Sequence, residues 1–583
     1  MTHLRRALPY ARPYRWPIGF GLVLVAFSNV AGILLPWLLG RAIDAMASEG
    51  VSLALILEQA ALIVGTAIFS GFARFGMRQL LNGVSRRIEI DLRDDVFRHM
   101  LHLDASFYGR MHTGELMSRL TNDTQAVRMA IGPGVMYLMN TAVTTVLALS
   151  IMIAYNARLT VISILPMLLL PPVMIYFGRV IHRKFERIQQ HFGVLSTMVQ
   201  ENLSGVRIVR AYSQETAQEA EFEALNQEYF QRNMALAKTS ALFHPLLAVL
   251  TGLGILTVLW FGGIDVMTGR NTPGEFVAFF FYLGQLAWPM IAIGWVINLF
   301  QRGAASMGRI IQVLDAEPAV REHAQPTVVA RPRGDVEFRD VWFRYPGTER
   351  DVLRGVSFHI PAGETAALVG PTGSGKSTIV SLITRRHDPT RGMVLLDGVP
   401  LDRIPLDQLR TMIALVPQDA FVFSDTIAEN IALGLPPGVE RDGRIEQAAD
   451  IARLSETIAA FPDGFETRLG ERGVNLSGGQ RQRATLARAI ARDARVLILD
   501  DSLSAVDTQT ETEILRGLSD VIARRTAIIV SHRVSAVMNA DRIFVLDDGA
   551  IVERGTHSQL IEQAGLYASL LRRQLLTETL DVG

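Results

Sequence analysis

A glycine-rich segment between residues 370 and 378 has the residue types and the spacing that bind phosphate groups. It reads Gly370, Pro371, Thr372, Gly373, Ser374, Gly375, Lys376, Ser377 and Thr378, which matches the pattern G-x-x-x-x-G-K-[ST]. A buried strand is expected just before it, so the loop runs from a strand into a helix. Glycines let backbone N–H groups approach phosphates, and a helix N-terminus favours anions. We expect Lys376 to reach the β- and γ-phosphates of a nucleotide and Ser377 to bind Mg²⁺.

Other residues that can act on a nucleotide lie before and after this loop. Val496–Asp500 reads as a buried strand that ends in a carboxylate, a group that binds Mg²⁺. A further buried strand, Ala527–Val530, is followed by His532. Taken singly these residues are ambiguous, because a lone histidine is more often structural and an aromatic residue such as Tyr345 needs no special function.

The order and spacing of these segments resemble those of type IV (B-type) ABC exporters, and the resemblance covers essentially the whole chain. Asn475–Gln480, which reads Asn-Leu-Ser-Gly-Gly-Gln, resembles the signature motif of that family. Gln418 matches its Q-loop, Ser504–Asp507 its D-loop and His532 its switch histidine. The resemblance implies two domains: an all-α transmembrane domain of six long helices, and an α/β P-loop nucleotide-binding domain.

The resemblance also implies the cofactors, ATP and Mg²⁺, and a role for each motif residue. Tyr345 would stack on adenine. Mg²⁺ would be bound by Ser377, Gln418 and Asp500, and the catalytic residues would be Asp501, His532 and Gln418. In the family, the signature loop of one domain caps ATP held by the phosphate loop of another. The residues that would act in this way across a dimer are Ser477, Gly478, Gly479 and Gln480.

Residue 501 departs from the family pattern. Most active members have glutamate after the Mg²⁺-binding aspartate, where it orients the attacking water, whereas this chain has Asp501. The missing methylene withdraws the carboxylate by about 1.5 Å, and a misplacement of about 1 Å can cost ~10²-fold in rate. We therefore expect this chain's own ATP site to be weak. The intact signature loop favours a heterodimer in which a second half-transporter has the competent site; a slow homodimer is the alternative.

The first half of the chain contains six apolar stretches long enough to cross a bilayer as helices. Hydrophobic residues make up 49% of the chain, and its mean hydropathy is +0.24. A soluble core would not hold so many such stretches, so the sequence predicts a multi-pass protein in contact with the lipid bilayer. The predicted spans are Trp16–Leu39, Leu53–Phe72, Val135–Tyr155, Leu159–Arg179, Leu242–Met267 and Phe276–Phe300.

Basic residues predict the orientation of these spans. Arginines are concentrated in the N-terminal segment and in the two long links, whereas the three short links hold only Arg41, Arg158 and Arg270. Because cytoplasmic segments carry the excess of basic residues, we expect both termini and both long links to be cytoplasmic. The predicted location is the inner (cytoplasmic) membrane.

Each long link contains a segment that resembles the intracellular loops of ABC exporters. These segments are Phe107–Thr124 and Glu201–Glu215. The resemblance implies that short coupling helices at Thr113–Thr124 and Leu203–Ala211 contact nucleotide-binding domains. Within the spans, Asn29, Asn140, His244 and Gln285 are candidates for a translocation pathway, with interhelical hydrogen bonding as the alternative. Prolines at 166, 171, 172, 245 and 289 are expected to kink their helices.

The predicted domains are a transmembrane domain at 1–312, a linker at 313–333, a nucleotide-binding domain at 334–573 and a tail at 574–583. The favoured function is ATP-driven export of hydrophobic or amphipathic substrates (drugs, lipids or peptides) by alternating access. Alternatives are a homodimeric lipid or drug exporter, an ATP-gated channel and a regulatory subunit. The net charge of zero argues against a nucleic-acid partner, and the absence of cysteine excludes disulfides.

Overall fold

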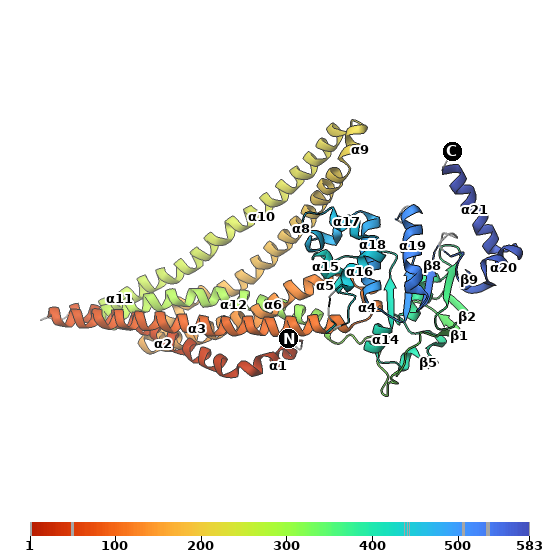
Figure 1. Cartoon of the computed structure of the whole chain (residues 1–583). Coiled ribbons are helices and arrows are strands. Elements are labelled where there is room, and N and C mark those ends of the chain that lie inside the picture. Colours follow the sequence, from red (N-terminus) through yellow and green to blue (C-terminus); the bar gives the residue numbers. More distant parts are fainter. Residues whose placement is uncertain are drawn as a thin grey trace. The chain divides into compact units, whose positions relative to one another are not determined.

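The computed structural model describes residues 3–47, 52–436, 438–439, 441, 443–503, 506, 508–531 and 537–581 (Figure 1). The chain forms two compact units. Unit 1 consists of residues 1–101 and 113–316, and unit 2 consists of residues 102–112 and 317–583. The residues 102–112 of the first long link therefore belong to the second unit.

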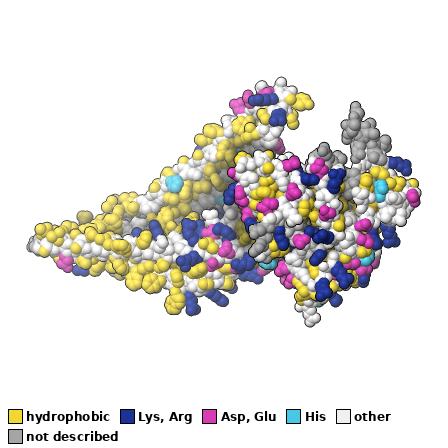
Figure 2. Space-filling model, viewed as in Figure 1, with side chains coloured by type: hydrophobic (Ala, Val, Ile, Leu, Met, Phe, Trp, Pro, Cys, Tyr) yellow, Lys and Arg dark blue, Asp and Glu magenta, His cyan; other side chains and the backbone are white. Residues whose placement is uncertain are grey.

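Unit 1 is built from helices, several of them much longer than a bilayer is thick. Its α-helices are α1 (Leu8–Ala11), α2 (Arg15–Ala47), α3 (Leu53–His102), α5 (Thr113–Ser118), α6 (Thr124–Met129), α7 (Val135–Ile164), α8 (Leu170–Ser204), α9 (Val206–Ala211), α10 (Glu215–Thr257), α11 (Gly263–Met267) and α12 (Pro273–Leu314). Figure 1 shows α8 and α10 side by side, with α9 at their common tip. The centre of the unit is α12, which buries Phe279, Tyr282, Leu283 and Leu286 against its neighbours. Hydrophobic side chains cover much of the outside of these helices (Figure 2), as lipid contact requires.

Within the described residues, five helices are long and apolar enough to cross a membrane: His3–Ala47, Leu53–His102, Thr113–Ile164, Glu215–Met267 and Pro273–Leu314. The predicted span Leu159–Arg179 is not one continuous helix. It comprises the end of α7, a turn at Pro166, a 3₁₀ segment (Met167–Leu169) and the start of α8. Proline cannot donate the helical hydrogen bond, which explains the interruption. Pro171 and Pro172 stand in the first turn of α8, where no donor is needed, so they start this helix rather than kink it.

The third predicted span ends at Tyr155, and the structure shows why. Asn156 has non-helical dihedral angles inside α7, with φ −160° and ψ 96°. Its side-chain oxygen accepts a hydrogen bond from the Leu159 backbone N–H at 3.0 Å, as the N-cap of a helix does. Asn156 therefore separates the third apolar stretch from the fourth.

Unit 2 contains two sheets and the helices that cover them. The first sheet has the order β2-β1-β4-β5 and the second β10-β9-β3-β8-β7-β6. The strands are β1 (Val336–Phe343), β2 (Leu353–Ile360), β3 (Thr365–Val369), β4 (Arg391–Leu396), β5 (Val399–Pro400), β6 (Ile413–Val416), β7 (Val496–Asp500), β8 (Thr526–Val530), β9 (Arg542–Asp547) and β10 (Ala550–Gly555). The helices are α4 (Ala105–Arg110), α13 (Lys376–Ile383), α14 (Leu406–Met412), α15 (Ile427–Ala432), α16 (Arg444–Ile451), α17 (Ser455–Ala459), α18 (Gly478–Ala491), α19 (Thr508–Ile522), α20 (His557–Glu562) and α21 (Leu566–Asp581).

The strand β3 lies inside the second sheet, parallel to β8 and β9. Ala366 and Leu368 face the core that contains the buried residues of α13, whereas Ala367 and Val369 face the core that contains those of α18. This strand is covered on both faces, which is why it reads as a continuous apolar run. The strands β3, β8, β7 and β6 are parallel, so their carboxyl ends meet at one edge.

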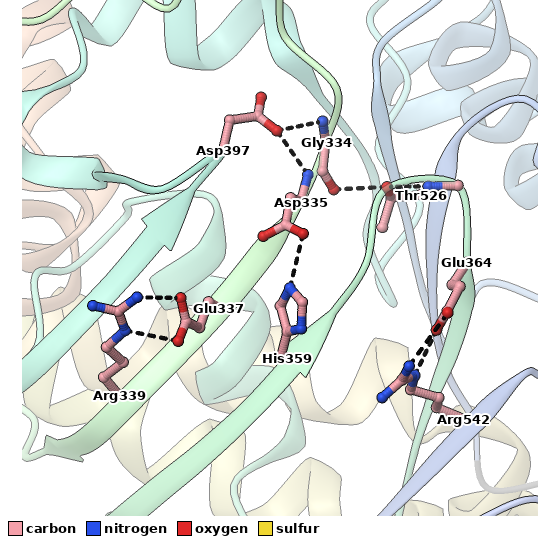
Figure 3. A network of polar contacts seen from close by, with 10 residues as sticks. Gly334, Asp335, Glu337, Arg339, His359, Glu364, Asp397, Thr526 and Arg542 are labelled. Carbon is pink, nitrogen blue, oxygen red and sulfur yellow. Dashed lines mark hydrogen bonds and ion pairs between the residues drawn. The ribbon is translucent and has the colours of Figure 1, made fainter.

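A polar network ties the entry of β1 to both sheets (Figure 3). The Asp397 carboxylate accepts hydrogen bonds from the backbone N–H groups of Gly334 and Asp335, at 3.0 and 2.9 Å. On the other side, the Thr526 hydroxyl donates to the Gly334 carbonyl at 2.6 Å. Gly334 has a φ of +96°, and a Cβ there would lie 2.9 Å from the Thr526 hydroxyl oxygen, so glycine is required. These contacts fix β1, the first strand of unit 2.

Candidate functional site

The phosphate loop leaves the buried carboxyl end of β3 and leads into α13, as the sequence predicts. Gly370 has a φ of +154°, and a Cβ on it would lie 2.1 Å from the Leu546 carbonyl oxygen. Gly375 has a φ of +104°, and a Cβ there would lie 2.7 Å from the side chain of Leu353. Only glycine fits at these two positions, because a Cβ would collide there. Without side chains at these positions, the backbone of the loop can approach a bound ligand closely.

Lys376 and Ser374 of the loop have buried side chains. The Lys376 ammonium donates to the carbonyl oxygens of Gly370 and Pro371, both at 2.8 Å. Burial lowers the pKa of Lys376 below its ordinary value, and the charges of Asp501 and Asp500 act in the opposite direction. The Ser374 hydroxyl is also buried, and among the described residues its oxygen has no hydrogen-bond partner.

Asp500 and Ser377 meet beside the loop. Asp500 ends β7 and is 8% exposed. Burial raises the pKa of Asp500, and the nearby charge of Asp501 raises it further; Arg386, Lys376 and a hydrogen bond from the Ser377 side chain act the other way. A buried carboxylate beside a hydroxyl at this position is the donor set of a hard cation such as Mg²⁺.

Asp501 is held in an uncommon backbone conformation. Its φ is +45°, in the left-handed region, and its N–H donates to the Val530 carbonyl at 2.8 Å. The hydrogen bond fixes the backbone to β8, and the carboxylate acts electrostatically on both Lys376 and Asp500. Asp501 therefore lies among the phosphate-loop and metal-site residues.

The other predicted site residues are placed as follows. The Tyr345 hydroxyl lies 3.2 Å from the Thr378 hydroxyl, and its half-buried ring packs edge-on against Phe343. Gln418 is exposed just beyond the carboxyl end of β6, at the same sheet edge as Asp500. His532 and most of the predicted D-loop, Ser504–Asp507, lie outside the described residues.

The signature segment begins α18. Ser477 is the N-cap of this 14-residue helix: its hydroxyl accepts from the Gln480 N–H, and the Gln480 side chain accepts from the Ser477 N–H at 2.8 Å. This capping box assigns Gln480 a local structural role that the sequence analysis did not give it. The Ser477 side chain stays exposed, and Gly478 and Gly479 follow in the first turn.

The residues present fit ATP and Mg²⁺. The glycine backbone leaves room for phosphate oxygens, Lys376 provides a cation, and the buried Ser374 hydroxyl lacks a partner among the described residues that a phosphate oxygen would supply. Ser377 and Asp500 provide the oxygen ligands for the cation.

Comparisons with known proteins agree with this geometry. Residues 18–290 match the family described as "ABC transporter transmembrane region", and residues 353–504 match that described as "ABC transporter". The "probable multidrug resistance ABC transporter ATP-binding/permease protein YheI" of Bacillus subtilis (strain 168) is 39% identical over 95% of this chain and 94% of its own length. The chain belongs to the ABC transporter family.

Other relatives define the type of transporter. The "multidrug resistance-like ATP-binding protein MdlA" of Escherichia coli (strain K12) is 36% identical over 98% of this chain and 96% of its own length. The "ATP-dependent lipid A-core flippase" of Vibrio vulnificus (strain YJ016) is 35% identical over 88% of each chain. A solved bacterial Atm1-family ABC exporter with ATP bound has a TM-score of 0.80 at 27% identity, covering 96% of this chain and 99% of that one.

The predicted fold class is therefore confirmed: a helical transmembrane domain is followed by an α/β nucleotide-binding domain. The transporter is a multi-pass ABC exporter half-transporter, and its nucleotide domain implies ATP-coupled transport.

The sequence analysis missed a contact between the first long link and the nucleotide domain. Within unit 2, the Asp104 carboxylate caps α4, accepting from the N–H groups of Ser106 and Phe107, and also accepts from those of Ala319 and Val320. Burial acts to raise the pKa of Asp104, but these four donors outweigh it and the pKa lies below its ordinary value.

The link residues His102–His112 thus belong to the same compact unit as the nucleotide-binding domain, and Thr113–Thr124 belongs to unit 1. The contact of Thr113–Thr124 and Leu203–Ala211 with nucleotide-binding domains stays a prediction. The Ser106 hydroxyl also lies 3.4 Å from Nδ1 of His387, whose ring packs against Tyr345. No pattern in the sequence marked Asp104 or His387. The other predicted segment contains α9, in which Ile208 is exposed; Leu203 before this helix and Tyr212 after it are exposed as well.

Proposed function

We propose that this transporter exports hydrophobic or amphipathic substrates across the inner membrane by alternating access, as one half of a heterodimer with one weak and one competent ATP site. The substrates would be drugs, lipids or peptides, and both termini would be cytoplasmic. The names of the relatives, which refer to multidrug resistance and to a lipid A-core flippase, support the substrate range. The basic residues of the long links support the orientation.

The observation that carries the heterodimer proposal is the pairing of Asp501 with an intact signature helix. The left-handed backbone and the hydrogen bond to Val530 fix where the Asp501 side chain starts, so its shorter length is not compensated by a backbone shift. A carboxylate that falls short by about 1.5 Å orients the attacking water poorly. Ser477, by contrast, is exposed at the start of a well-capped helix and free to contact a nucleotide held by another subunit.

In this proposal each residue has a defined task. Lys376, Ser374 and the loop backbone bind the phosphates, Tyr345 stacks on adenine, and Ser377, Gln418 and Asp500 hold Mg²⁺, which neutralises phosphate charge when bound. Asp501, Gln418 and His532 belong to the weak site. The Ser477 hydroxyl and the backbone N–H groups of Gly478 and Gly479, at the start of α18, complete the partner's competent site, with Gln480 at its edge.

The experiment is ATP-driven uptake of a lipophilic dye into inside-out vesicles that contain this chain together with a second half-transporter. We expect uptake with both chains and none with either alone. Uptake by this chain alone at the full rate would instead support a homodimeric exporter. An ATP-dependent ion conductance without dye uptake would support a channel and would overturn the proposal of export.

A further inference from the structure

Three aromatic rings from two separate segments of unit 2 form a cluster. Phe343 ends β1, Tyr345 lies two residues beyond it, and His387 lies in the turn between α13 and β4. The His387 ring packs edge-on against the Tyr345 ring, with centroids 5.5 Å apart and an interplanar angle of 87°. It also lies 5.4 Å from the Phe343 ring, which packs edge-on against Tyr345 at 4.9 Å. Two other rings therefore hold the ring of Tyr345.

The tip of the Tyr345 side chain is held by the phosphate loop. Its hydroxyl lies 3.2 Å from the hydroxyl of Thr378, which is buried in the first turn of α13, two residues after Lys376. The hydroxyl contact fixes one end of the ring, and the rings of Phe343 and His387 limit how it can turn. A ring fixed in this way needs little further ordering when a nucleotide base stacks on it.

The turn that carries His387 is anchored by a buried cation. Arg385 has a φ of +49°, in the left-handed region that residues other than glycine seldom adopt. Its side chain is only 2% exposed and pairs with the Asp388 carboxylate at 2.9 Å. It also donates to the Arg321 carbonyl at 2.7 Å. The ion pair spans His387, so the turn itself sets the position of His387 beside Tyr345.

The His387 ring is also contacted from the first long link. Its Nδ1 lies 3.4 Å from the Ser106 hydroxyl, in α4. Burial lowers the pKa of His387 below its ordinary value of 6.5; the charges of Asp104 and Asp388 act to raise it, and that of Arg386 to lower it further. An imidazole with such a pKa is largely neutral at neutral pH, so His387 packs against Tyr345 as an uncharged aromatic ring.

We infer that His387 is a positioning residue for the nucleotide base: its ring holds Tyr345 in the orientation in which adenine stacks on it. The inference rests on the proposed role of Tyr345, and it assigns part of the affinity for the base to a residue that acts only through Tyr345. Binding of the phosphates by the loop around Lys376 does not depend on His387. The contributions of the base and of the phosphates can therefore be measured separately.

The test compares two competitors, MgATP and magnesium tripolyphosphate, which has the three phosphates but lacks the base and the ribose. Each competitor displaces an ATP photoprobe that crosslinks through its ribose, on the purified complex, and only the label incorporated into this chain is counted. The ratio of the two apparent affinities measures what the base and the ribose contribute, and it does not depend on the affinity of the probe. A change that merely damages the fold of the site weakens both competitors and leaves the ratio unchanged.

The variants separate the ring of His387 from its nitrogens and from Tyr345. They are His387→Ala, His387→Phe, Tyr345→Ala and the double variant with alanine at both positions. The matched control is His359→Ala, because His359 lies on β2 outside the ring cluster and pairs with Asp335 at 2.8 Å.

His387→Ala should lower the affinity ratio about twofold to tenfold, the range that the loss of one aromatic pair implies. His387→Phe should keep most of the ratio, because the ring remains. Tyr345→Ala should lower the ratio about tenfold or more, as the loss of a stacked base implies. Adding His387→Ala to Tyr345→Ala should cause no further loss, because His387 acts through Tyr345. His359→Ala should keep the native ratio.

Failure of this inference and failure of the proposed stacking have different signatures. A native ratio in His387→Ala beside a lowered ratio in Tyr345→Ala would overturn the inference and leave the stacking standing. Equal weakening of both competitors by His387→Ala, or a further fall of the ratio when it is added to Tyr345→Ala, would overturn the inference as well. A native ratio in Tyr345→Ala itself would refute the stacking, and with it the role of His387.

Discussion

The Ser374 hydroxyl is buried in the phosphate loop, and among the described residues it has no hydrogen-bond partner. Replacing it with alanine removes a buried polar group that costs about 1–3 kcal/mol when it is unsatisfied. If about 1 kcal/mol is recovered, the Tm of a domain of this size rises by about 2–4 °C. Ser374→Ala should therefore stabilise the nucleotide-free transporter.

The same change should weaken ATP binding, because the hydroxyl belongs to the phosphate loop and lies 2.9 Å from the position that a Cβ on Gly370 would take. A hydrogen bond to a charged group contributes about 1.5–3 kcal/mol, so its loss weakens affinity by about 10- to 100-fold. Thermal unfolding of the purified transporter, with and without MgATP, measures both effects, since the shift in Tm caused by ATP reports affinity. The expected pattern is a higher starting Tm and a smaller ATP shift.

The matched control is Ser381→Ala, one turn further along α13. The Ser381 hydroxyl donates to the Ser377 carbonyl of its own helix at 2.9 Å. Its loss should therefore change neither the Tm without nucleotide nor the ATP-induced shift in Tm by much. The reasoning about Ser374 is refuted if Ser374→Ala lowers the starting Tm, or if the ATP-induced shift stays at the native size.

Three further outcomes are expected. Lys376→Ala should weaken MgATP binding at this chain's own site; direct nucleotide binding to the purified complex checks this, and unchanged occupancy of both sites would refute the assignment. Gly370→Ala should prevent the phosphate loop from forming, since its Cβ would collide with the Leu546 carbonyl; loss of both ATP binding and thermal stability is the measurement, and native behaviour contradicts it. Asp104→Ala should uncouple ATPase activity from transport and lower stability. The pKa of Asp104 in the folded state lies below its ordinary value of 3.8, so the ionised carboxylate stabilises the fold fully at a pH well above 3.8. This stabilisation is lost as the pH falls below 3.8. The Tm values of the native chain and of Asp104→Ala should therefore converge in acid.

The phosphate loop could be predicted in detail because its requirements are local. Positive φ at Gly370 and Gly375 and a cation at Lys376 are fixed by spacing within nine residues. The apolar stretches of the membrane domain were equally readable, because composition alone decides whether a helix can enter lipid. The break at Pro166 was harder to predict, since proline both kinks and ends helices and only the neighbouring structure decides which occurs.

Contacts between distant segments could not be predicted from the sequence. Arg74 and Arg78 follow the predicted second span, yet in the structure they line a cavity together with residues of α2, α7 and α12 that are distant in the sequence. Likewise, nothing in the sequence places Asp104 within unit 2, because the backbone donors of Ala319 and Val320 that hold its carboxylate are more than 200 residues away.

The central claim is that this chain has a weak ATP site and completes a strong one. Steady-state ATP hydrolysis by Asp501→Asn and by Ser477→Arg, each assembled with the native partner, tests it most directly. The account predicts that Asp501→Asn keeps most of the activity, because this site was already slow, and that Ser477→Arg loses most of it, because the partner's site loses its cap. Near-complete loss of hydrolysis in Asp501→Asn, equal to the loss in Ser477→Arg, would contradict the degenerate site and favour a homodimer in which every site depends on Asp501.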